Sequence, residues 1–101
     1  MPEKKYDFVY WTDRSVSDSL SIQRYLREEF SQKEIDNFYK LLQAFEKIVL
    51  SFPKLYPVST RNKKVHRAVL SKQLSVFYTL SKGFINVVAV LDNRVGYSKW
   101  P

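Results

Sequence analysis

The chain has 101 residues, a formal net charge of +7, no cysteine and one histidine, and 45% of its residues are hydrophobic. This length and composition predict a single domain over residues 1–101 that buries one core without metals or crosslinks. They exclude a disulfide framework, a thiolate metal site and a metal centre built from imidazoles.

The N-terminal third predicts a strand followed by a helix. Tyr6 to Trp11 have the β-branched and aromatic composition of a strand and precede a polar Thr-Asp-Arg sequence. Ser15 and Asp18 resemble a capping box, so we expect a helix from Ser15 to about Phe30. Its apolar residues follow steps of three and four: Ile22, Tyr25, Leu26 and Phe30.

A second helix has the strongest pattern in the sequence. Ser31 and Glu34 form a capping-box pattern at its start, and Pro53 ends it because proline lacks the amide hydrogen and clashes with the preceding turn. Burial of six side chains at roughly 1.5–3 kcal/mol each gives on the order of 10 kcal/mol. This helix should therefore anchor the core through one face: Ile35, Phe38, Leu42, Phe45, Val49 and Phe52.

A basic loop and three strands are predicted for the second half. Pro53 to Lys64 contains prolines, a Ser-Thr pair and four basic residues, which is typical of a surface loop. Short polar turns separate the three strand candidates, Val65–Ser71, Leu74–Leu80 and Phe84–Leu91. The middle strand has one apolar face that includes Tyr78, and the last strand is apolar almost throughout, as a central strand is. The order is β-α-α-β-β-β, an α+β class.

One face of the predicted sheet should stay open for binding. Two consecutive helices pack on the same face, and a small sheet without a second helical layer leaves its other face uncovered. The pattern does not decide which of two alternating sets in the first of the three strands points inward: Lys63, Val65 and Arg67, or Lys64, His66 and Ala68. Either choice leaves at least two nitrogen-bearing side chains near the rim of the open face.

The positive charge lies in the second half of the chain. Residues 1–50 contain eight Lys and Arg against nine Asp and Glu, whereas residues 51–101 contain nine against one, Asp92. Ordinary solvated faces mix both signs, so this charge should serve a partner. Its field attracts polyanions at long range, which predicts RNA, DNA or an acidic protein segment.

The sequence shows no signal for export or for a membrane. The charged residues Met1 to Asp7 lead into no apolar region of the kind that secretion needs. The longest apolar run, Val87 to Leu91, is far shorter than the roughly 20 residues that span a bilayer. We expect a soluble cytoplasmic protein that uses no membrane, no metal and no cofactor.

Several short motifs occur in a fixed order along the chain: Val9-Tyr10-Trp11-Thr12, Ile22-x-x-Tyr25-Leu26, Phe52-Pro53, Phe77-Tyr78 and Leu91-Asp92-Asn93-Arg94. With the element order, the length and the basic charge, they resemble the RelE/ParE toxins of bacterial type II toxin-antitoxin systems. The resemblance covers almost the whole chain, and it departs at Ser15 and Ser19, where a small Ala and an apolar residue are more usual. It implies two N-terminal helices packed on one face of a small twisted, mainly antiparallel four-stranded sheet.

The resemblance also implies an acidic cognate antitoxin as partner and one of two activities. RelE-like members cut messenger RNA in the ribosomal A site without a metal, using Lys and Arg to stabilise the charge of the transition state. ParE-like members bind DNA gyrase and trap it on cleaved DNA. We expect ribosome-dependent mRNA cleavage, with gyrase poisoning as the alternative. A non-toxic basic nucleic-acid-binding domain is a third interpretation.

The family's catalytic positions carry over only in part. Arg94 matches the arginine at the end of the last strand, although it could simply pair with Asp92. Ser75 stands where many RelE-like members have an arginine, and His66 and Ala68 stand roughly at paired lysines. Ser75 and Ala68 favour the gyrase alternative. The catalytic candidates are Arg94, Arg67, His66 and Tyr97, with Trp100 near them as a terminal aromatic. The RNA- or phosphate-binding candidates are Arg61, Lys63, Lys64 and Lys72. We expect Lys63, Arg67 and Arg94 on one uncovered cationic surface.

Overall fold

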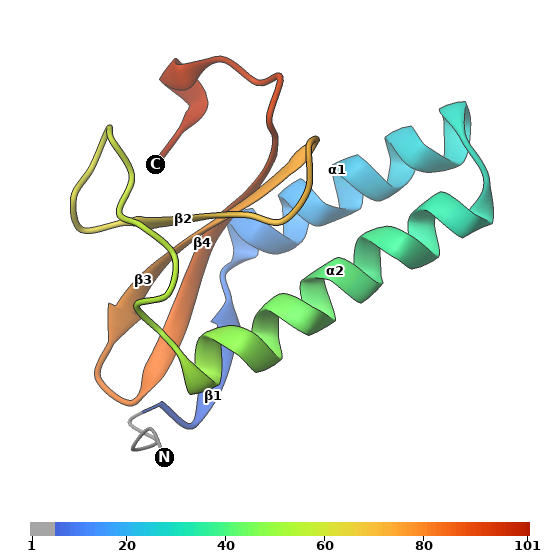
Figure 1. Cartoon of the computed structure of the whole chain (residues 1–101). Coiled ribbons are helices and arrows are strands. Elements are labelled where there is room, and N and C mark those ends of the chain that lie inside the picture. Colours follow the sequence, from blue (N-terminus) through green and yellow to red (C-terminus); the bar gives the residue numbers. More distant parts are fainter. Residues whose placement is uncertain (1–5) are drawn as a thin grey trace.

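The helices and strands follow one another in the order that the sequence predicts. The computed structural model describes residues 6–101 (Figure 1). The elements are β1 (Phe8–Trp11), α1 (Asp13–Glu29), α2 (Gln32–Ser51), β2 (His66–Val69), β3 (Leu74–Ser81), β4 (Phe84–Asp92) and a C-terminal 3-10 turn, η1 (Tyr97–Lys99). Both helices lie side by side against one face of the sheet (Figure 1), so the predicted α+β arrangement is confirmed.

The four strands form one mainly antiparallel sheet in the order β1-β4-β3-β2. β4 pairs with β3 in antiparallel fashion and with β1 in parallel, so it is the central strand that its apolar sequence predicts. The register between β3 and β4 shifts, because Phe77 is paired with Ala89 while Tyr78 is paired with Val87. Val88 is therefore an extra residue, and this bulge reverses the alternation of β4 side chains beyond it.

The start of α1 differs from the prediction. Thr12 is the N-cap, and its hydroxyl oxygen accepts a hydrogen bond of 3.2 Å from the Ser15 amide. Ser15 is instead buried inside the helix, and Asp18 accepts a hydrogen bond of 3.1 Å from the amide of Val90 in β4. The predicted capping box is therefore wrong. Ser15 and the similarly small, buried Ser19 leave room for α1 to lie close to β4.

α2 begins and ends where the sequence predicts, and its apolar face forms the core. Ser31 is the N-cap, although its side chain makes no capping hydrogen bond, so the predicted capping box is absent here too. Phe52 lies just beyond the helix and is 53% exposed, contrary to the expectation that it belongs to the buried face. The other five predicted residues are buried: Ile35, Phe38, Leu42, Phe45 and Val49. Tyr78 is fully buried opposite them, as predicted.

Tyr78 gives the core a pH-dependent contact that can be tested. Its hydroxyl donates a hydrogen bond of 2.7 Å to the Pro53 carbonyl oxygen, and burial raises its pKa well above the usual value near 10. The folded state thus favours the neutral phenol, and this contribution to stability is complete below about pH 10 and is lost at higher pH.

Tyr78→Phe should therefore lower the free energy of unfolding by about 1 kcal/mol near pH 7, because one hydrogen bond is lost. It should also make stability less sensitive to pH above about 10. Urea unfolding at pH 7 and at alkaline pH measures both effects. An identical loss of stability at alkaline pH in the wild type and the variant would contradict the assignment.

Candidate nucleic-acid interface

The two faces of the sheet have different neighbours. Ala68 and Val76 pack with the helices in the main core, whereas Arg67 and its partner Phe77 on β3 point to the opposite side. We call this second side the outer face. The outer face is open only in part, because the C-terminal segment crosses it and places Trp100 against Phe77, with ring centres 5.3 Å apart.

Arg67 is held firmly on the outer face. Its Nε donates a hydrogen bond of 3.2 Å to Ser75 Oγ, and its Nη2 donates one of 3.2 Å to Asn93 Oδ1. Asn93 is fixed in turn, because its Nδ2 donates to two carbonyl oxygens of the β2–β3 turn. A guanidinium has five N–H donors, so donors remain for a phosphate after these two hydrogen bonds.

Aromatic rings extend this site away from Arg67. The guanidinium carbon of Arg67 lies 4.4 Å from the centre of the Trp100 ring, and the Trp100 and Tyr97 rings are 4.8 Å apart. The guanidinium carbon of Arg61 lies 5.4 Å from the centre of the Tyr97 ring. These four residues, Arg67, Trp100, Tyr97 and Arg61, are called the stacked row. Two cations flanking two aromatic rings are suited to phosphates and bases.

Contacts from three parts of the chain position the stacked row. Trp100 rests on the fully buried Phe77. The Nη2 of Arg14, in the first turn of α1, donates a hydrogen bond of 2.8 Å to the Lys99 carbonyl oxygen. The hydroxyl of Thr60 donates a longer one, 3.4 Å, to the Tyr97 hydroxyl. The C-terminal aromatics are therefore held by α1, β3 and the basic loop together.

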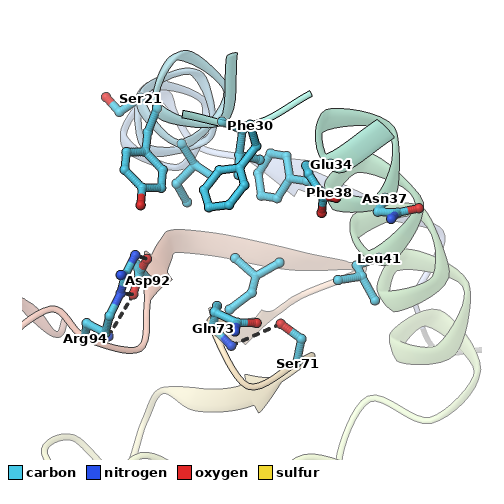
Figure 2. Close-up of a pocket in the computed structure, with 14 residues that line it drawn as sticks. Ser21, Phe30, Glu34, Asn37, Phe38, Leu41, Ser71, Gln73, Asp92 and Arg94 are labelled. Carbon is cyan, nitrogen blue, oxygen red and sulfur yellow. Dashed lines mark hydrogen bonds and ion pairs between the residues drawn. The ribbon is translucent and has the colours of Figure 1, made fainter. Parts of the chain in front are cut away.

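Arg94 lies on the helix side and not with Arg67. Its Nε and Nη2 donate hydrogen bonds of 3.0 and 2.7 Å to the Asp92 carboxylate, and its guanidinium carbon lies 5.9 Å from the Tyr25 ring centre. Figure 2 shows this pair at one end of a pocket of about 580 Å³ between the helices and the β2–β3 turn. The expectation that Lys63, Arg67 and Arg94 share one surface is wrong for Arg94, because the bulge at Val88 turns residues 92 and 94 toward the helices.

The ion pair between Arg94 and Asp92 can be tested through the pKa of Asp92. Hydrogen bonds from Arg94 lower the pKa of the Asp92 carboxyl below its usual range. Arg94→Ala should raise that pKa toward its usual value, and the stability that the ionised Asp92 contributes near neutral pH and loses on acidification should then disappear. NMR titration of the Asp92 side chain measures the shift. An unchanged titration midpoint would show that the pair does not form in solution.

The remaining predicted site residues are spread over the surface. His66 faces the helix side, with its ring stacked on Tyr78 at 5.0 Å and its Nδ1 2.8 Å from the Tyr56 carbonyl oxygen. Lys63, Lys64 and Lys72 are exposed in the turns that flank β2. Of the eight predicted residues, the stacked row brings together three: Arg61, Arg67 and Tyr97.

The residues that orient Arg67 belong to no pattern that predicts this role from the sequence. Ser75 was interpreted as the loss of a family arginine, and it serves here as an acceptor for the arginine of the neighbouring strand. Asn93, which belongs to the Leu91-Asp92-Asn93-Arg94 motif, accepts the second hydrogen bond from Arg67. A sequence feature that points to these residues is the polar Ser75 in a strand that is mostly apolar and buried. A buried hydroxyl needs a partner, and the partners lie on the adjoining strand and after β4.

Within residues 6–101, no group of three or more His, Asp and Glu side chains is placed to hold a metal ion. None of the helices in this part of the chain has the length and apolar character that crossing a bilayer requires.

Comparison with known proteins bears on the fold. No protein-family model matches the sequence, and no curated protein is significantly similar to it. One chain of the chromosomal ParDE TA system from P. aeruginosa has a TM-score of 0.74 at 10% identity, covering 89% of this chain and 98% of that chain. One chain of the E. coli DinJ-YafQ toxin-antitoxin complex has a TM-score of 0.53 at 12% identity, covering 92% and 98%. At these identities the likeness shows the fold, and it confirms the arrangement that the sequence resemblance implies.

Proposed function

We propose that this chain, which has the fold of the RelE/ParE toxins, is the toxin of a toxin-antitoxin pair and inhibits growth by cutting messenger RNA on the ribosome. The observation that carries the proposal is the stacked row, which combines two guanidinium groups with two aromatic rings on the outer face. The positive electrostatic field of residues 51–101 would attract a polyanion to the stacked row.

The stacked row offers groups for a cleavage that uses the RNA's own nucleophile. The 2′-oxygen attacks the adjacent phosphorus and loses its proton to water, the bond from phosphorus to the 5′-oxygen breaks, and a 2′,3′-cyclic phosphate remains. Arg67 would bind the non-bridging oxygens and stabilise the charge that grows on them. The exposed Tyr97 hydroxyl would donate a proton to the leaving 5′-oxygen, and water would then restore that proton.

An acidic antitoxin is the partner that the charge supports. Both similar structures are toxin-antitoxin complexes. An acidic segment that orders on binding would complement the positive charge of residues 51–101, which contain nine basic residues and one acidic residue. By covering Arg61 and Arg67, such a segment would prevent RNA from binding to the stacked row.

Expression of the chain alone in bacteria tests the proposed activity. Growth should stop, and mapping of transcript 5′ ends should show new cuts within translated messages. Co-expression of the product of the adjacent gene, if that product is short and acidic, should restore growth. Intact messages in arrested cells would refute mRNA cleavage while leaving toxicity in place.

Gyrase poisoning is the second candidate, and two observations favour it. The position of one paired lysine of RelE-like members is occupied by Ala68, which is fully buried in the helix-side core. The TM-score is also higher with the ParDE chain than with the DinJ-YafQ chain. A supercoiling assay with purified gyrase decides between the candidates, since only a gyrase poison should leave cleaved DNA.

A further inference from the structure

A second group of aromatic rings lies on the outer face, away from the stacked row. It consists of Phe8 and Tyr10 from β1 and Phe84 from β4, and we call it the aromatic platform. The Phe8 and Phe84 rings stack with centres 5.3 Å apart and planes 9° apart, and Tyr10 meets Phe84 edge-on at 6.3 Å. Phe8 is 51% exposed and Tyr10 is 48% exposed. Large aromatic side chains grouped on a solvated sheet surface indicate a binding surface.

The strand pairing places the platform on the same face as the stacked row. Phe8 is paired with Phe84, and their neighbours Val9 and Ile85 pack in the helix-side core. Side chains alternate along a strand, so the platform points to the outer face. The bulge at Val88 then keeps Ala89 on the outer face, where it packs with Phe77 and Trp100.

We propose that the aromatic platform is a base-stacking subsite for single-stranded RNA, which binds across the outer face from the stacked row to β1. The identity of the ligand rests on the proposed function. The exposed rings offer π-faces on which any base can stack. The exposed Lys82 lies in the β3–β4 turn beside Phe84 and supplies a cation for the backbone. The amide of Asn86, which donates a hydrogen bond of 3.4 Å to the Thr79 hydroxyl, presents polar groups between the rings and the rest of the sheet.

The separation of the two sites suits a short strand of RNA. Arg67 is paired with Phe77 on β3, four residues from Ser81, which is paired with Phe84. Four residues span about 13 Å along a strand, and two strand spacings add about 10 Å across the sheet, which places Phe84 roughly 16 Å from Arg67. At about 3.4 Å for each stacked nucleotide, five nucleotides cover this distance, and fewer are needed in an extended strand.

The size and charge of the surroundings favour RNA over a protein partner. Phe8 and Tyr10 are about half exposed and Phe84 is less exposed, so three aromatic side chains of roughly 150–250 Å² each offer at most roughly 300 Å². A stable protein interface needs about 800 Å² on each partner. The polar Asn86 and the cationic Lys82 border the aromatic platform, and the cations of the stacked row lie farther along the same face. A small aromatic surface that shares a face with cations fits a strand that supplies both bases and phosphates.

Binding of a 2′-O-methyl RNA 12-mer to the full chain tests the platform, because the blocked 2′-oxygen permits binding without cleavage. Fluorescence anisotropy should show at least fivefold weaker binding for Phe8→Ala, the low end of the effect expected for one lost base stack. Phe8→Leu should show a similar loss while keeping the apolar volume, and Phe8→Trp should restore affinity. Phe30→Ala, which removes an exposed ring from the helix side, should bind as the wild type does.

An abasic 12-mer with the same backbone separates stacking from charge. The Phe8→Ala loss should disappear with this probe, whereas a loss caused by Arg67→Ala should remain. Wild-type affinity of both Phe8→Ala and Phe8→Leu, with Arg67→Ala weakened, would overturn the platform and leave the proposed function standing. Wild-type affinity of all three would count against both proposals. Concentration-dependent dimerisation that Phe8→Ala abolishes, with RNA affinity unchanged, would assign the patch to a second copy of this chain.

Discussion

Replacing Arg67 with alanine should reduce RNA cleavage by on the order of 100-fold and relieve growth inhibition, while the protein remains folded. Removal of one preorganised donor from a transition-state oxyanion typically has an effect of this size. The guanidinium is preorganised here, since Ser75, Asn93 and Trp100 hold it before any ligand binds. Single-turnover cleavage of a ribosome-bound message measures the rate, and circular dichroism confirms the fold.

Two variants make the result specific. Arg67→Lys keeps the charge but loses the planar fork, so it should recover only part of the activity. Arg24→Ala removes one positive charge from the exposed surface of α1, away from the outer face, and should cleave as the wild type does. If Arg67→Ala and Arg24→Ala lose activity equally, the effect is one of net charge, and the stacked row is not the site.

Periodicity in the sequence identifies the fold because it depends on local geometry. The three- and four-residue steps from Ile35 to Val49 match the helix period, and all five residues of that face are buried. Polar turns and alternation delimit β3 and β4 to within a residue or two. The caps are less predictable: Ser15 fits a capping pattern, yet it is buried inside α1, and Thr12 is the N-cap.

The site depends on features that no local pattern contains. Regular alternation of side chains along β4 would place Arg94 on the same side of the sheet as Phe84. The extra residue at Val88 shifts this alternation, so Arg94 lies on the helix side and Asn93 on the outer face. The stacked row needs the C-terminal segment to fold back over the sheet, which depends on long-range contacts such as the one from Arg14 to Lys99. The family resemblance includes Arg94 in a motif, but it does not indicate on which side of the sheet the Arg94 side chain lies.

Replacing Phe45 with alanine should have the largest effect on stability, about 3–5 kcal/mol. Phe45 is 1% exposed at the centre of the core, where its ring meets those of Trp11, Tyr56 and Tyr78 at 6.3, 5.9 and 5.6 Å. These neighbours come from three parts of the chain, so a cavity at Phe45 cannot close by movement of one side chain.

The loss is a large share of the total, because domains of this size have about 5–15 kcal/mol of stability. Urea unfolding followed by tryptophan fluorescence measures it, since Trp11 lies against Phe45 and reports on this part of the core. Ile48→Ala, on the same helix but 39% exposed, should lose much less. A loss below about 1 kcal/mol for Phe45→Ala would mean that α2 does not pack on the sheet through this face, and the outer face would then lose its status as the uncovered side.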